Sequence, residues 1–154
     1  MTIVIRIPSV AAKALSVGAA AAALVVGLTG SASAAAYDYE DPISSGCANT
    51  AITAQSTGIY VGSTRVGTIE LRYSTGCRTV WARVKSTGPY GGATVTRTSD
   101  YDWDRCGSLS YNSSMGQYTC YTRMLNDAGV ESYAHGSASA SNGYNSDEYQ
   151  TASY

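Results

Sequence analysis

The clearest pattern in the chain is an alternation of apolar and polar side chains over residues 67–85, which read GTIELRYSTGCRTVWARVK. A period of two is typical of strands that bury one face. The turn-forming residues 74–76 divide the stretch, so it predicts a β-hairpin with Cys77 just past its connection. In the second strand, the pattern separates two faces: Val80, Ala82 and Val84 against Trp81, Arg83 and Lys85.

Shorter β-branched runs between turn residues extend this pattern. They predict further strands over residues 59–61, 94–98, 118–125, 130–139 and 148–154. Residues 126–129, Asn-Asp-Ala-Gly, predict a tight hairpin turn, and residues 48–55 fit either a short helix or a first strand. With no amphipathic helix of ten residues, the chain is predicted to be all-β: a small antiparallel barrel or sandwich of about seven short strands.

The first 36 residues have the pattern of a secretory signal peptide. Arg6 and Lys13 lie near the start, residues 14–28 are almost uninterruptedly apolar, and small residues place cleavage after Ala34 or Ala36. A permanent membrane anchor is the alternative, but the run is short and ends in a cleavage pattern. Residues 37–154 are therefore predicted to be a single secreted domain, extracellular and with no membrane attachment.

Cysteine count and charge refine this prediction. An even number of cysteines in an exported chain predicts two disulfides, with three connectivities open. They are Cys47, Cys77, Cys106 and Cys120. A zinc site is the alternative, but no two cysteines are closely spaced. Without the signal peptide the chain has 8 basic and 11 acidic residues, a net charge of −3 that disfavours nucleic acid and anionic surfaces as partners. We expect a monomer without a cofactor.

The core motif ELRYS-x-x-C-x-x-x-WAR, residues 70–83, follows Asp-Pro at 41–42 and Gly-Cys-Ala at 46–48. Over residues 37–98 the chain resembles the YjfA-like domain of unknown function, found chiefly in actinomycetes and related Gram-positive bacteria. The resemblance implies a secreted or extracytoplasmic domain, and it carries over no catalytic residue. It also implies the pair Cys47–Cys77, which leaves Cys106 with Cys120.

Asp100, Asp102 and Asp104 form an acidic motif with functional potential. In an extended strand their carboxylates would share a face, repel one another and attract a cation. The motif resembles the start of an EF-hand loop, but Arg105 and Tyr111 occupy the positions of the required Gly and Glu. We therefore favour a solvated acidic loop with Arg105 as counterion, and expect that Asn at all three positions stabilises the fold slightly.

Two further groups are weighed as sites. Glu70 and Arg72 lie opposite Trp81 and Arg83 in the predicted hairpin. One interpretation is structural: a charge pair across the two strands, with a guanidinium group stacked on the indole ring. The other is that these four side chains form a polar binding strip. His135 is the only histidine, and the sequence places no evident catalytic partner beside it.

The aromatic residues include 13 Tyr and no Phe. Tyrosine packs in small cores that lie close to the surface, and it is also common in binding surfaces. The tyrosines in the second half of the chain could contact a glycan or a peptide. They are Tyr111, Tyr118, Tyr121, Tyr133, Tyr144, Tyr149 and Tyr154. The favoured function is a secreted, non-enzymatic binding or structural module for an unknown protein or glycan, such as an inhibitor or a wall-associated protein. The alternatives are a small extracellular hydrolase using the acidic-loop carboxylates and a weak calcium-binding module.

Overall fold

The computed structural model describes residues 34–154, so residues 1–33 of the predicted signal peptide lie outside the described part. Two short 3₁₀ helices, η1 (Ala34–Tyr37) and η2 (Cys47–Thr50), precede the strands. The strands are β1 (Ala51–Val61), β2 (Thr64–Ser74), β3 (Thr79–Ser86), β4 (Gly91–Arg97), β5 (Trp103–Cys106), β6 (Ser110–Asn112), β7 (Gln117–Tyr121), β8 (Leu125–Asn126), β9 (Ser132–Ala138) and β10 (Tyr149–Gln150).

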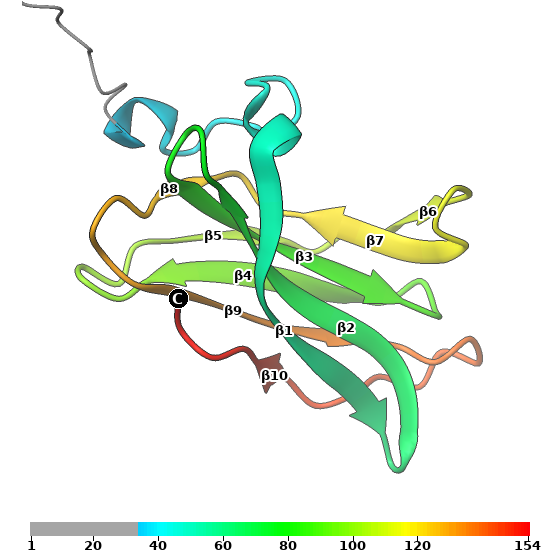
Figure 1. Ribbon diagram of the computed structural model, residues 1–154. Coiled ribbons are helices and arrows are strands. Elements are labelled where there is room, and N and C mark those ends of the chain that lie inside the picture. Colours follow the sequence, from blue (N-terminus) through cyan, green and yellow to red (C-terminus); the bar gives the residue numbers. More distant parts are fainter. Residues whose placement is uncertain (1–33) are drawn as a thin grey trace, which may run out of the picture.

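These strands form two antiparallel sheets that pack on each other (Figure 1). The larger has the order β1-β2-β3-β7-β6, with β8 paired to one end of β3. The smaller has the order β10-β9-β4-β5. Neither sheet closes on itself. The predicted all-β fold is confirmed, and of its two forms the structure has the sandwich.

The predicted central hairpin is confirmed as β2 and β3, which pair along their full overlap. Ile69, Leu71 and Val84 are fully buried on the inner side of the larger sheet. They pack against Val95 of β4 and Ala134 of β9 in one hydrophobic core. The alternation in residues 67–85 therefore separates the core of the sandwich from the outer face of the larger sheet.

The hairpin predicted at residues 126–129 is wrong. β7 and β9, which that turn was expected to join, lie in different sheets. After β7 the chain crosses along the end of the sandwich, where β8 pairs with Val80 of β3, and only then enters the smaller sheet. A turn sequence fixes the local backbone but not the sheet that the next strand joins, which depends on where each strand buries its apolar side.

Both disulfides implied by the resemblance are confirmed. Cys47–Cys77 ties η2 to the turn between β2 and β3, with Cα atoms 5.7 Å apart. Cys106–Cys120 joins β5 of the smaller sheet to β7 of the larger one, with Cα atoms 6.1 Å apart. In the chain-entropy picture each stabilises the fold by about 3–4 kcal/mol. Two disulfides in so small a domain are typical of an oxidising extracellular or periplasmic environment.

Candidate functional site

The predicted charge pair lies on the outer face of the larger sheet. Glu70 and Arg83 are direct partners across β2 and β3, with Arg83 Nη2 2.6 Å from Glu70 Oε2. Lys85 Nζ contacts the other carboxylate oxygen. Burial of Glu70 favours its neutral form, but hydrogen bonds from Lys85 and Arg83 prevail and hold its pKa below the usual value. One nearly buried carboxylate thus fixes two cations in place.

Trp81 does not form part of an exposed strip. It is 4% exposed and packs with Cys47 and Met124 in a second, smaller core on the outer side of the sheet. Arg72 lies opposite Trp81 in the register, but its guanidinium donates to Thr53 Oγ1 and to the carbonyl of Ala51. The expected stacking on the indole is thus replaced by hydrogen bonds to β1.

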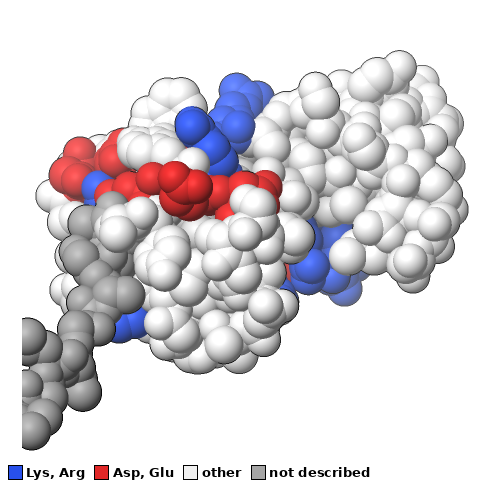
Figure 2. Space-filling model, turned by 90° about the horizontal axis from the view of Figure 1, so that it is seen from above, with Lys and Arg blue, Asp and Glu red and all other residues white. Residues whose placement is uncertain are grey.

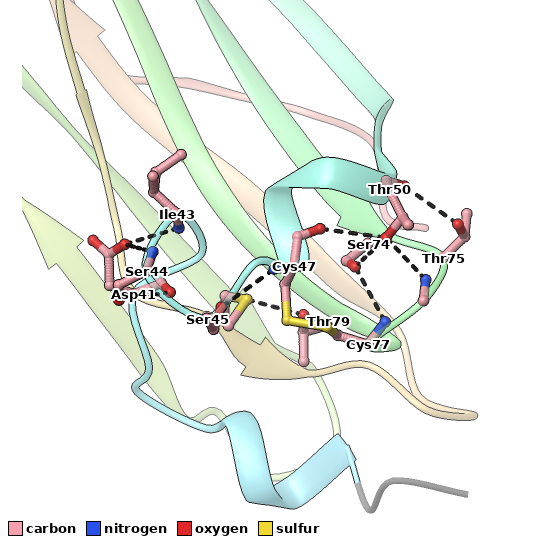
Figure 3. The surroundings of a disulfide bond; sticks show 12 residues. Asp41, Ile43, Ser44, Ser45, Cys47, Thr50, Ser74, Thr75, Cys77 and Thr79 are labelled. Carbon is pink, nitrogen blue, oxygen red and sulfur yellow. Dashed lines mark hydrogen bonds between the residues drawn. A yellow bond between two sulfur atoms is a disulfide. The ribbon is translucent and has the colours of Figure 1, made fainter.

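The N-terminal arm, residues 37–50, covers Trp81. Figure 3 shows how its fold is fixed: Asp41 Oδ1 accepts the backbone N–H groups of Ile43 and Ser44 at 2.8 and 2.9 Å. These two hydrogen bonds lower the pKa of Asp41, and the bond from Ser44 has the larger effect. Further along, Thr50 Oγ1 lies 2.8 Å from Ser74 Oγ, beside the first disulfide (Figure 3). The arm therefore divides the outer face of the larger sheet into a covered end and an open part.

The acidic motif is held by arginines other than the predicted one. Arg97, which is 8% exposed, donates to Asp100 Oδ2 at 2.8 Å and to Asp102 Oδ2 at 3.1 Å. Its Nη1 atom reaches Asp38 Oδ2 in the arm at 3.2 Å. Arg97, and not Arg105, is therefore the counterion, because its side chain reaches both the motif and the arm.

Asp104 points to a different partner. It is 8% exposed and accepts the backbone N–H of Arg123 at 2.8 Å, together with Nε at 3.1 Å and Nη2 at 2.7 Å. The three carboxylates do not line one strand face, since Tyr101 has a φ of 58° and β5 begins only at Trp103. Figure 2 shows acidic side chains as a band across this end of the molecule, with Lys and Arg beside it.

This arrangement restricts the chemistry of the acidic motif. Hydrogen bonds from Arg97 lower the pKa of Asp100 to about 2, whereas the general acid of a glycosidase needs a raised pKa. Within residues 34–154, no three His, Cys, Asp or Glu side chains are grouped so as to hold a metal ion. His135 lies apart from the motif, with Nδ1 2.9 Å from Glu148 Oε1.

Sequence reasoning missed a cleft of about 530 Å³ beside the second disulfide. Its lining includes Cys106, Ser110, Tyr111, Asn112, Cys120 and Tyr121. Two tyrosines on its rim are exposed, Tyr111 by 60% and Tyr121 by 39%. The ring of Tyr111 is supported by an edge contact with Tyr118, their centroids 5.2 Å apart.

The cleft forms because β6 is short. β6 begins at Ser110, opposite Thr119 of β7, and its pairing with β7 ends there. The preceding residues, 107–109, connect β6 to β5 of the smaller sheet. The group of tyrosines in the second half of the chain signalled part of this surface. Tyr111 and Tyr118 are direct partners on one side of the sheet, whereas Tyr121, three residues further along β7, points to the other side. Tyr111 and Tyr121 both line the cleft.

The cleft is continuous with the charged outer face. Tyr121 is the direct partner of Arg83, and Thr119 that of Lys85, so these side chains share one side of the sheet. A second hollow of about 330 Å³ lies further along it, lined by Arg65, Thr68, Thr87 and Gln117 among others. We call this open part of the sheet the polar face, defined by Arg65, Glu70, Arg72, Arg83, Lys85 and Tyr121.

Residues 35–135 match the model of a family described as "Protein of unknown function (DUF2690)", and the chain belongs to this family. The match includes the central hairpin and both disulfides. No curated protein and no solved structure matches the chain. Among the residues that the structure describes, no helix is long and apolar enough to cross a membrane.

Proposed function

We propose that the chain is a secreted, non-enzymatic binding module of the YjfA-like type, and that it binds a glycan on the polar face. The observation that carries this proposal is the cleft beside Cys106–Cys120, which places two exposed tyrosine rings among hydroxyl and amide groups. A sugar presents an apolar C–H face, which stacks on a ring, and hydroxyl groups at its edges. The cleft volume of about 530 Å³ lies within the usual range for ligand sites.

A polar ligand also fits the rest of the open face better than an apolar one. Arg65 and Thr87 are exposed there, Thr68, Arg83 and Lys85 are partly exposed, and none of these offers an apolar anchor. The hot spots of protein interfaces are usually buried aromatic or aliphatic anchors. Trp81, which could have served as one, is covered by the arm.

Binding to a panel of insoluble polysaccharides tests the proposal. Tyr111→Ala and Tyr121→Ala should each weaken retention about tenfold, because a buried aromatic contact contributes on the order of 1–2 kcal/mol. Tyr90→Ala is the matched control, since Tyr90 is 58% exposed and lies on another loop. Thermal melts establish that each variant folds. Equal retention of all three variants, or no retention of the parent by any polysaccharide, would contradict glycan binding in the cleft.

Export is the second part of the proposal. It rests on the signal-peptide pattern of the first 36 residues and on the two disulfides. N-terminal sequencing of the protein from the culture medium should begin at Ala35 or Tyr37. A sequence that begins at Met1 or Thr2 would show that the leader is retained.

A further inference from the structure

Charge is distributed unevenly over the molecule. The six residues that define the polar face include four of the eight basic side chains after position 36 and one of the eleven acidic ones, Glu70. Asp41 of the arm lies at the border of the face, where its Oδ2 accepts a hydrogen bond from Tyr121 Oη at 3.3 Å. The face therefore carries a charge of +3, while the rest of residues 37–154 carries −6. Figure 2 shows acidic side chains gathered in a band on the side of the molecule seen from above. The net charge of −3 thus conceals a cationic surface beside the tyrosine cleft.

Arg72 is the least satisfied of these cations. Its Nε atom is buried from solvent and has no hydrogen-bond partner among the described residues. Burial, and then the charge of Arg83, lower its pKa. A buried donor without an acceptor costs roughly 1–3 kcal/mol, so the surroundings of Arg72 favour an added negative charge.

The neighbouring cations are already held in position. The side chains of Arg83 and Lys85 are 23% and 26% exposed, and both are fixed by Glu70. Because this carboxylate supplies one negative charge against two positive ones, the group keeps an excess of positive charge. Partly desolvated charges in a fixed arrangement bind an anion more strongly than mobile surface lysines do.

We infer that the polar face binds an acidic polysaccharide, with carboxylate groups on the polymer bound by Arg65, Arg72 and the Arg83–Lys85 pair. This inference rests on the proposed glycan binding and specifies the class of glycan. Guanidinium groups match the geometry of carboxylates. A nucleic acid fits less well, since single strands require successive stacking rings, and Tyr121 is the single aromatic residue among those that define the polar face.

The probe is polygalacturonate, compared with its fully methyl-esterified form, which has the same backbone without the charge. Binding is measured by calorimetry with the folded, disulfide-bonded domain. Polygalacturonate should bind at least about tenfold more tightly, and the difference should shrink as sodium chloride is raised from 0.05 to 0.5 M, about the range over which surface charges become screened.

Paired variants locate the site. Arg65→Gln with Arg72→Gln should weaken polygalacturonate binding about tenfold or more, because hydrogen bonds to charged groups are the stronger ones. Arg78→Gln with Arg105→Gln changes the net charge equally but at exposed positions outside the face, and should change binding less than about twofold. Neither pair removes a partner of Glu70.

The outcomes separate the two proposals. Equal binding of the charged and esterified polymers would overturn the acidic-glycan inference and leave glycan binding intact. Binding of neither polymer, with retention on a neutral polysaccharide, would also overturn only the inference. If the two double variants lose affinity equally, the attraction comes from net charge and not from this face. Self-association abolished by Arg65→Gln with Arg72→Gln, without polymer binding, would identify a second copy as the occupant and overturn the inference.

Discussion

Replacing the aspartates of the acidic motif by asparagine tests whether repulsion or pairing dominates there. From the sequence alone, three carboxylates in a row repel one another, and their neutralisation should stabilise the fold. In the structure Asp100 and Asp102 both face Arg97, and Asp104 faces Arg123. The expected effect therefore changes sign. The triple variant D100N/D102N/D104N should be less stable than the parent.

Asp104 sets the magnitude, because it is the most buried of the three. Its Oδ2 atom accepts a backbone N–H and its Oδ1 atom accepts two guanidinium N–H groups. Asparagine keeps one acceptor oxygen and turns an NH₂ group toward a donor. Loss of one such buried partner costs about 1–3 kcal/mol. A loss of about 2 kcal/mol lowers the melting temperature of a domain of this size by roughly 6–12 °C.

Thermal melts of the triple variant, of D104N alone and of the control Asp147→Asn decide the matter. Asp147 is exposed and takes part in no ion pair among the described residues, so its variant should melt within about 2 °C of the parent. Melts are repeated with calcium and with EDTA. A triple variant that melts at or above the parent would refute the pairing argument. A deficit seen only with calcium would assign the stabilisation to a bound ion and not to the arginines.

Two further predictions concern buried side chains. Trp81→Ala should lower the free energy of unfolding in urea by about 3–5 kcal/mol, as expected for a buried aromatic residue. Trp103→Ala, at a position that is 58% exposed, should lower it by less than about 1 kcal/mol. Equal losses would mean that the arm does not bury Trp81. Burial raises the pKa of Asp127 from 3.8 to about 6, although Ser132 donates a hydrogen bond to it. Between about pH 4 and 6 the folded protein then keeps a proton that the unfolded chain has lost, so stability falls as pH rises through this window by roughly 2 kcal/mol. The melting temperature of Asp127→Asn should match the parent near pH 4 and exceed it above pH 6; a constant difference across that range would contradict the burial argument.

Much of the fold was predictable because strand alternation is a local signal. Residues 67–85 predicted β2, β3 and their facing side chains, and the core follows from them. The structural features that could not be predicted, such as strand length and strand pairing, depend on distant parts of the chain. β1 extends over residues 51–61, although glycine and polar residues interrupt its pattern, because β2 offers a partner along its whole length. The turn at 126–129 was misjudged for the same reason.

The candidate site was predictable only in part. The register places Glu70 opposite Arg83, as the sequence indicated. The cleft at Tyr111 and Tyr121 depends on where β6 ends, and the concentration of positive charge depends on which strands become neighbours. Neither has a sequence signature, and net charge, which averages over the surface, suggested that anions would be repelled.

The N-terminal arm decides how much of the outer face is core and how much is surface, which leads to a last prediction. Trp81 and Arg83 lie on the same side of β3, yet one is buried and the other lies on the open face. The difference is the arm, whose η2 helix is fixed by Cys47–Cys77. Removing this disulfide should therefore expose Trp81, while the cleft keeps its own disulfide, Cys106–Cys120. The arm also contacts the cleft directly, since Tyr121 Oη donates a hydrogen bond to Asp41 Oδ2 at 3.3 Å.

In a Trp103→Phe background, Trp81 is the only tryptophan, so its fluorescence reports the arm alone. Replacing Cys47 and Cys77 by alanine should shift the emission to longer wavelength and lower the stability by about 2–5 kcal/mol. Polysaccharide binding at a temperature where the variant is folded should stay within about threefold of the parent. Tyr121 and Arg83 keep their backbone partners in the sheet, and only the exposed hydrogen bond from Tyr121 Oη to Asp41 is affected by release of the arm. An unchanged emission maximum would show that hydrogen bonds and packing hold the arm without the disulfide. A loss of binding in the folded variant would show that the arm forms part of the ligand site.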